Sequence, residues 1–174
     1  DLVFPSNVRT IGDAAFRETN ITSIVLPENL EYLGEQAFVN CGSLKGGITF
    51  PEKIGSIPQE CFTGCGNLTG TIVFKGEITE IGKRAFDYCA ISGSLIIPNS
   101  CTSIGDRAFS RNRLSSILLP ESLANIGEDA FADNNLMGVI RIPEEVTIVP
   151  SGAFAHNPLI QGLILGNQIT AIDD

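Results

Sequence analysis

The chain has 174 residues, enough for one domain with a sizeable hydrophobic core, and its 43% hydrophobic and 18% charged residues are typical of folded chains. Its 11 Lys and Arg against 20 Asp and Glu give a formal net charge of −9, which argues against nucleic acid and anionic membrane surfaces as partners. No apolar run approaches the length of a transmembrane helix, so we expect no direct membrane insertion.

A phenylalanine preceded by alanine or cysteine recurs along the whole chain. Successive copies lie 22, 24, 24, 23, 22 and 23 residues apart. A period of about 20 to 30 residues predicts a solenoid, in which each repeat packs only on its neighbours. We expect a single domain over residues 1–174 with about seven and a half repeats, and a fragment truncated at both ends because no atypical capping repeat is visible. The phenylalanines are Phe16, Phe38, Phe62, Phe86, Phe109, Phe131 and Phe154.

Each repeat begins with a short strand that ends at a proline slot. This slot lies eleven residues before the phenylalanine in all seven complete repeats, and Lys75 and Gly166 occupy it where proline does not. The residues before it alternate with period two and are rich in β-branched types, which predicts a strand of about three to five residues. Proline ends the strand because it has no N–H to donate. One parallel strand per repeat would form a long sheet on one face, from residues 24–26, 48–50, 72–74, 95–97 and 117–119.

The second half of each repeat contains a glycine four residues before the phenylalanine, replaced twice by Pro58 and Pro150. Glycine marks a turn, and an acidic residue after it suits the first turn of a helix. We therefore expect one short helical turn per repeat, with the phenylalanine side chains stacked as a column through the core. The acidic residues at this position are Asp13, Glu35, Asp106 and Glu128.

The cysteines fall within the same register. Small polar residues and cysteines recur three residues after each phenylalanine, and such groups can satisfy backbone atoms that a sheet leaves unpaired. Cys61 replaces the alanine before a phenylalanine, and Cys101 replaces an apolar core residue. The five cysteines are therefore interpreted as packing residues, while a strained bridge between Cys41 and Cys65 stays open. The ladder positions are Thr19, Cys41, Cys65, Cys89, Asn112, Asn134 and Asn157.

The combined pattern, C/N-x-x-L-x(2–4)-I-x-I-P-x-x-L-x-x-I-G-x-x-A-F-x-x-C/N, resembles the BspA-type leucine-rich repeat over the whole chain. The resemblance implies an α/β solenoid, a right-handed, curved superhelix with its sheet on the concave side. It also implies a cell-surface or secreted protein, implicated in adhesion to a host protein or another cell-surface protein. If a eukaryote secretes this protein, the sequons at Asn20 and Asn67 would accept glycans.

Catalytic signals are missing from the sequence. It has no G-x-S-x-G motif, P-loop, dinucleotide-binding motif or zinc-ligand spacing, so we expect neither an enzyme nor a cofactor or metal site. His156, the one histidine, falls at a variable surface position. The acidic pairs at 128–129, 144–145 and 173–174 are interpreted as a solvated rim rather than a calcium site.

The outward face of the predicted sheet carries the candidate binding residues. Alternation points the residue two before the proline slot toward solvent, and six of the eight such residues are aliphatic. The row beside it is small, and the prolines form a third row. Contiguous exposed apolar surface often marks an interaction site, so we expect a protein partner to bind here. The candidates are Val3, Val25, Thr49, Val73, Ile96, Leu118, Arg141 and Ile164.

Two alternatives stay open. β-branched residues can occupy strands for propensity alone, without any partner. The solenoid can also act as a structural spacer that presents another domain and has no partner of its own. A non-catalytic, adhesin-like binding module is the first hypothesis, and the spacer is the second.

Overall fold

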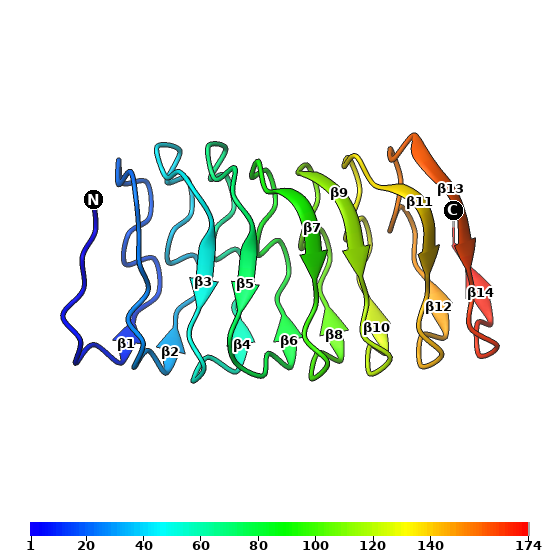
Figure 1. Ribbon diagram of the computed structural model, residues 1–174, viewed down its shortest axis with the longest axis horizontal. Coiled ribbons are helices and arrows are strands. Elements are labelled where there is room, and N and C mark those ends of the chain that lie inside the picture. The colour runs from blue at the N-terminus through cyan, green and yellow to red at the C-terminus, as the bar shows by residue number, and fades with distance from the viewer. Residues whose placement is uncertain (174) are drawn as a thin grey trace.

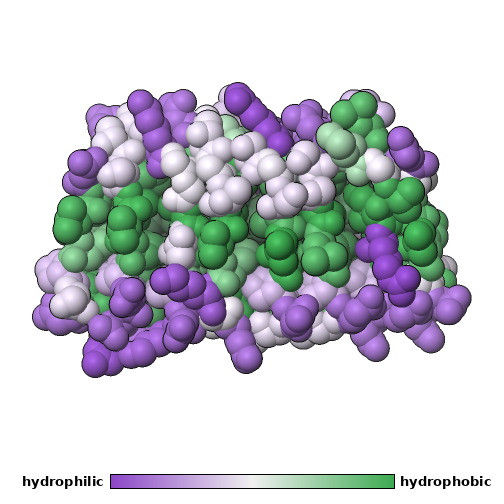
Figure 2. Space-filling view, in the orientation of Figure 1, coloured by the Kyte–Doolittle hydropathy of each residue, from purple (hydrophilic) through white to green (hydrophobic). Residues whose placement is uncertain are grey.

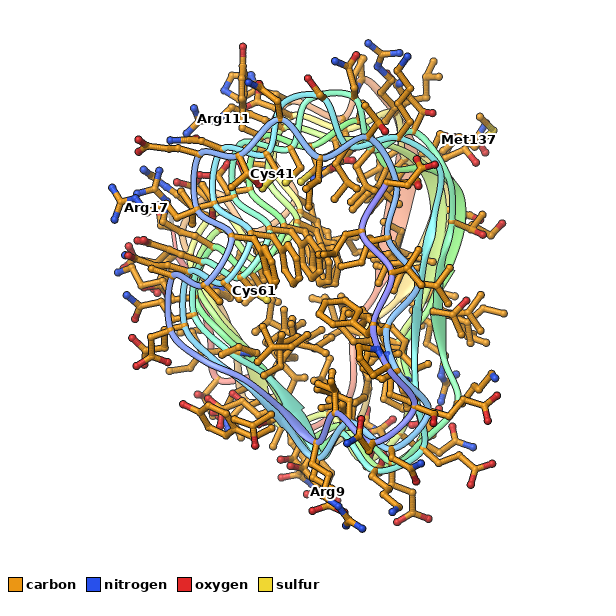
Figure 3. The ribbon with its side chains drawn as sticks, turned by 90° about the vertical axis from the view of Figure 1, so that its left-hand side faces the viewer. Arg9, Arg17, Cys41, Cys61, Arg111 and Met137 are labelled. Atoms are coloured by element: carbon orange, nitrogen blue, oxygen red, sulfur yellow. The ribbon has the colours of Figure 1, made fainter. Side chains whose placement is uncertain are left out.

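The computed structural model describes residues 1–173, so Asp174, the predicted C-terminal boundary and second member of the 173–174 pair, lies outside the described residues. The chain forms an elongated stack of rungs with its termini at opposite ends (Figure 1). Seen from the N-terminal end, the chain passes clockwise from Arg9 to Arg17 while it advances away from the viewer (Figure 3). The solenoid is therefore right-handed, as expected, and its curvature stays a prediction.

The strands predicted around residues 48–50, 72–74, 95–97 and 117–119 lie side by side along one face of the stack (Figure 1), whereas residues 24–26 form only an isolated bridge. Their alternating burial agrees with the sequence pattern, as in Ile48–Phe50, where only Thr49 is exposed. The expected continuous sheet is instead hydrogen-bonded in parallel pairs, β3 with β5, β7 with β9 and β11 with β13, and the first two rungs share a single bridge from Leu2 to Ile24. These strands are β3 (Ile48–Phe50), β5 (Ile72–Phe74), β7 (Ser92–Ile96), β9 (Arg113–Leu118), β11 (Met137–Arg141) and β13 (Leu159–Ile164).

Every rung also contains a second strand of two residues, which the sequence reading did not anticipate. The glycine that follows it donates to the preceding rung, for example from Gly105 N to Ile81 O at 2.8 Å. Pro58 and Pro150 lack this N–H, and the second sheet is interrupted between β2 and β4 and between β10 and β12, immediately before these prolines. The short strands are β1 (Thr10–Ile11), β2 (Tyr32–Leu33), β4 (Ser56–Ile57), β6 (Glu80–Ile81), β8 (Ser103–Ile104), β10 (Asn125–Ile126), β12 (Ile148–Val149) and β14 (Ala171–Ile172).

The predicted helical turn is wrong, because residues 1–173 contain no helix. The segment around each phenylalanine consists of overlapping turns, such as Arg17 N to Ala14 O at 3.1 Å, that alternate with bonds to the next rung, such as Phe16 N to Ala37 O at 2.8 Å. Residues two before and two after each phenylalanine have positive φ, as at Ala14 (51°) and Glu18 (58°). A right-handed helix does not admit such residues.

The glycine and the acidic residue that suggested a helix have other roles. A Cβ atom on Gly127 would overlap the backbone nitrogen of Asp106 in the preceding rung, so glycine permits the close approach between these two rungs. Asp106 Oδ1 accepts a hydrogen bond from Glu128 N of the next rung at 3.2 Å, and Asp13 Oδ1 accepts one from Glu35 N at 3.0 Å. The aspartates therefore connect rungs instead of capping helices.

The phenylalanine column is present as predicted. Consecutive rings stack with centroid separations between 5.0 and 5.7 Å and interplanar angles of 10° or less. The five inner rings, Phe38 through Phe131, have no exposed surface. A second stacked pair, Phe50 and Phe74, lies beneath the long strands, and Phe50 meets the column edge-on at Phe62 and Phe86.

The predicted ladder satisfies the carbonyl groups of this column. Cys65 Sγ donates to Phe38 O at 3.2 Å, and Asn134 Nδ2 donates to Phe109 O at 2.8 Å. Asn134 Oδ1 also accepts from Leu114 N at 3.0 Å, a bond that a cysteine does not reproduce. The ladder residue of each rung therefore binds the phenylalanine backbone of the rung before it.

Replacing Phe86 by alanine should cost about 3 to 5 kcal/mol of unfolding free energy, since the ring is fully buried and stacked on both sides. Urea denaturation followed by circular dichroism measures this loss. Phe154→Ala is the matched control and should cost less, because this ring is partly exposed and stacks on Phe131 alone. A loss below about 1 kcal/mol for Phe86→Ala would contradict a buried column.

Candidate functional site

Possible catalytic and metal-binding groups are dispersed over the solenoid. Within residues 1–173, no three His, Cys, Asp or Glu side chains lie close enough to hold a metal ion. His156 is exposed on a turn. The acidic pairs join neighbouring rungs: Asp129 Oδ2 lies 3.0 Å from Arg107 Nη2, and Glu144 Oε2 accepts from Asn167 N at 2.8 Å. In the described part of the chain, no helix is long and apolar enough to span a membrane.

The five cysteines are free and buried, so the open Cys41–Cys65 bridge is not formed. Burial raises the pKa of Cys61 well above its ordinary value and raises that of Cys101. The thiolate, which is the nucleophile, is therefore suppressed at neutral pH. The cysteines serve the core and the ladder, as the sequence register indicated.

The two sequons lie on exposed turns. Asn20 and Asn67 are both exposed, and Asn67 Nδ2 donates to Gly42 O of the preceding rung at 2.6 Å.

The outward residues of the long strands form a line with the equivalent residues of the first two rungs, which we call the outer row: Val3, Val25, Thr49, Val73, Ile96, Leu118, Arg141 and Ile164. All eight side chains are exposed. Among the valines, the exposed fraction ranges from 46% at Val73 to 84% at Val3. Figure 2 shows a hydrophobic band across the face that carries these strands, with hydrophilic residues below it and mainly residues of intermediate hydropathy directly above it. The predicted orientation of every outer-row residue is therefore observed.

The neighbouring rows differ from each other. The row two residues earlier is small, and Ser94 Oγ and Ser116 Oγ form a hydrogen bond of 2.6 Å across it. The proline row contributes little surface, because Pro27, Pro51, Pro120 and Pro143 are buried, which corrects the expectation of a third exposed row. The aliphatic side chains of the outer row therefore protrude beyond the buried prolines that border the row on one side.

Two hollows lie on different faces of the solenoid. One of about 390 Å³ opens on the outer row beside Thr49 and is also lined by Val25, Gly47, Glu28 and Lys75. A larger one of about 770 Å³ lies where β2 and β4 are unpaired, lined by residues including Tyr32, Ser56, Pro58, Glu80 and Lys83. Its Lys83 Nζ lies 3.1 Å from Asp106 Oδ2, an ion pair between rungs.

The sequence reading missed a row of carboxylates beside the outer row. Glutamate follows the proline in four repeats, at Glu28, Glu52, Glu121 and Glu144, and we call these four residues the glutamate edge. Glu121 Oε1 lies 3.4 Å from Nε of Arg141, the one cation of the outer row. The recurring Pro-Glu dipeptide was the available signal.

Comparison with known proteins agrees with this architecture. The family model for the BspA type leucine rich repeat region, with 6 copies, matches residues 1–109 and 70–174. This chain belongs to that family. Curated proteins gave no match. Leucine-rich repeat proteins of the BspA type are typically surface or secreted, generally interact with other proteins, and are generally non-catalytic.

Two solved structures resemble this BspA-type chain closely. A leucine-rich repeat protein from Bacteroides ovatus superposes with a TM-score of 0.87 and 30% identity over 96% of this chain and 43% of that one. The leucine-rich repeat protein of T. pallidum gives a TM-score of 0.77 and 26% identity over 94% of this chain and 77% of that one. The chain thus spans less than half the length of the Bacteroides ovatus protein.

The burial of the cysteines predicts that the native protein resists thiol reagents. We expect Ellman's reagent at neutral pH to modify none of the five cysteines within minutes, and all five in concentrated guanidinium chloride. The absorbance of released thionitrobenzoate gives both counts. Rapid reaction of any native thiol would contradict the burial of the ladder.

Proposed function

We propose that this chain is a non-catalytic protein-binding module of an adhesin-like surface or secreted protein, and that the outer row contacts the partner. The observation that carries the proposal is the exposed aliphatic line along one face, with Val25, Ile96 and Leu118 each more than 60% exposed. Such contiguous apolar surface is uncommon on soluble monomers outside interaction sites. The partner would be a host protein or another cell-surface protein.

The scaffold supports this proposal because it separates stability from recognition. The phenylalanine column and the ladder hold the backbone, while the outer-row side chains make no hydrogen bond or ion pair within residues 1–173 except at Arg141. Substitutions in the row therefore change the surface without opening the core. The spacer alternative uses the same rigid stack but assigns no role to the row.

The triple change Val73→Asp, Ile96→Asp and Leu118→Asp should abolish binding without unfolding the protein, because it introduces charge at three exposed positions. A phage library that displays proteins and peptides can be selected against the wild type and then tested on the variant. We expect the selected clones to lose binding to the variant, while its thermal melting follows that of the wild type.

The matched control carries Tyr32→Asp, Tyr88→Asp and Ile148→Asp, which add the same charge at exposed positions away from the outer row. It should retain the selected clones. Equal retention by the outer-row variant would contradict the proposed binding face, and a library that yields no binder would favour the spacer.

A further inference from the structure

The two sides of the outer row are chemically unequal. On one side lie serine, threonine, glycine and a single valine, and on the other lies the glutamate edge. Glu28 and Glu52 form no ion pair within residues 1–173, and both are exposed. Glu28 also lines the hollow that opens beside Val25 and Thr49, so this carboxylate borders the apolar surface directly.

The protein itself shows how a cation lies on this surface. Arg141 occupies an outer-row position, and its guanidinium turns to Glu121 of the preceding rung, with 3.4 Å between Nε and Oε1. A side chain that crosses the outer row can thus place a positive charge against the glutamate edge. Lys75 lines the same hollow as Glu28 and Glu52 but pairs with neither, so both carboxylates are open to a cation from another molecule.

The carboxylates are grouped toward the two ends of the row. Glu28 and Glu52 belong to adjacent rungs, as do Glu121 and Glu144, while Lys75 and Asn99 lie on the rungs between them. With about 4.8 Å between hydrogen-bonded strands as the rung spacing, the two groups, four rungs apart, are separated by roughly 19 Å. A complementary partner places one basic group against Glu28 and Glu52, and a second against Glu121 and Glu144, where Arg141 already pairs with Glu121 and Asn167 N donates to Glu144.

The rung spacing favours a helix over an extended chain. One outer-row side chain is presented for each rung, and hydrogen-bonded parallel strands such as β3 and β5 lie about 4.8 Å apart. An α-helix parallel to the solenoid axis presents one face every turn, about 5.4 Å, whereas alternate residues of an extended strand are about 6.6 Å apart. Over four rungs the helix falls out of step by only about 2 Å, whereas the strand falls out of step by about 7 Å.

We infer that the outer row receives an amphipathic α-helix of a partner protein, parallel to the solenoid axis, with basic residues along one flank. Its apolar face covers the aliphatic row, its basic flank meets the glutamate edge, and its other flank passes the row of small residues. Two basic clusters separated by about three and a half turns, or roughly 13 residues, match the two carboxylate groups. This inference rests on the proposed function and names the partner element.

Three labelled peptides of about 22 residues test it. The first peptide is a helix with leucines on one face and lysines on one flank, at its first two and last two turns. The second replaces these lysines by glutamate. The third carries two central prolines that break the helix. We expect fluorescence anisotropy to show that the first peptide binds at least about tenfold more tightly than either twin, and less tightly as salt is raised.

Variants of the protein locate the interaction. Glu28→Gln, Glu52→Gln, Glu121→Gln and Glu144→Gln together should weaken the first peptide about tenfold, since each exposed pair contributes only a fraction of that factor. The control, Glu18→Gln, Glu35→Gln, Glu80→Gln and Glu128→Gln, changes the net charge equally at exposed positions away from the edge. It should leave affinity within about twofold.

The outcomes separate this inference from the proposed function. Equal binding of all three peptides, lost only in the outer-row aspartate variant, would overturn the helix and charge requirement and leave the proposed binding face standing. Equal weakening by both sets of glutamine substitutions, or no binding of the first peptide, would also overturn the inference. The library selection judges the proposed function independently.

Discussion

Each inner phenylalanine of the column is fixed by its ring and by its backbone. The rings stack on both neighbours, the amide of Phe86 donates to Ala108 O at 2.8 Å, and its carbonyl accepts from Asn112 Nδ2 at 2.8 Å. Because eleven residues separate the proline slot from the phenylalanine in every complete repeat, fixing the ring also fixes the strand on the opposite side of the rung. Length variation is confined to the segment after the phenylalanine, where it does not disturb this register.

This constraint explains why the molecule presents a line instead of a pocket. Similar rungs place equivalent positions at a regular spacing along the axis. An inward residue that recurs in successive repeats therefore produces a column, and an outward residue type that recurs produces a row. The outer row and the glutamate edge are two such rows on one face. Recognition by this solenoid therefore favours an elongated partner element. The unequal flanks of the outer row determine which side of that element faces the glutamate edge.

The sequence predicted the parts of the fold that depend on side-chain periodicity. The strands, the buried column, the ladder and the direction of every outer-row residue follow from which side chains recur at which spacing. The helical turn failed because left-handed backbone at Ala14, Tyr88 or Arg107 leaves no compositional signal, unlike glycine. The two-residue strands are too short to show a period, although the replacement of glycine by Pro58 and Pro150 marked where their sheet is interrupted. The glutamate edge could be recognised only after the structure showed that the proline slot borders the exposed face of the strands.

The central claim is that the phenylalanine register turns one residue of each strand outward and its neighbour inward. Cysteine labelling at two adjacent positions of β5 tests it most directly, since the native thiols are buried. The account predicts that a maleimide reagent modifies the Val73→Cys variant at the rate of an exposed thiol and leaves the Ile72→Cys variant protected until it unfolds, in line with exposures of 46% and 7% for the native side chains. Faster labelling at position 72 than at position 73 would contradict the register and with it the outer row.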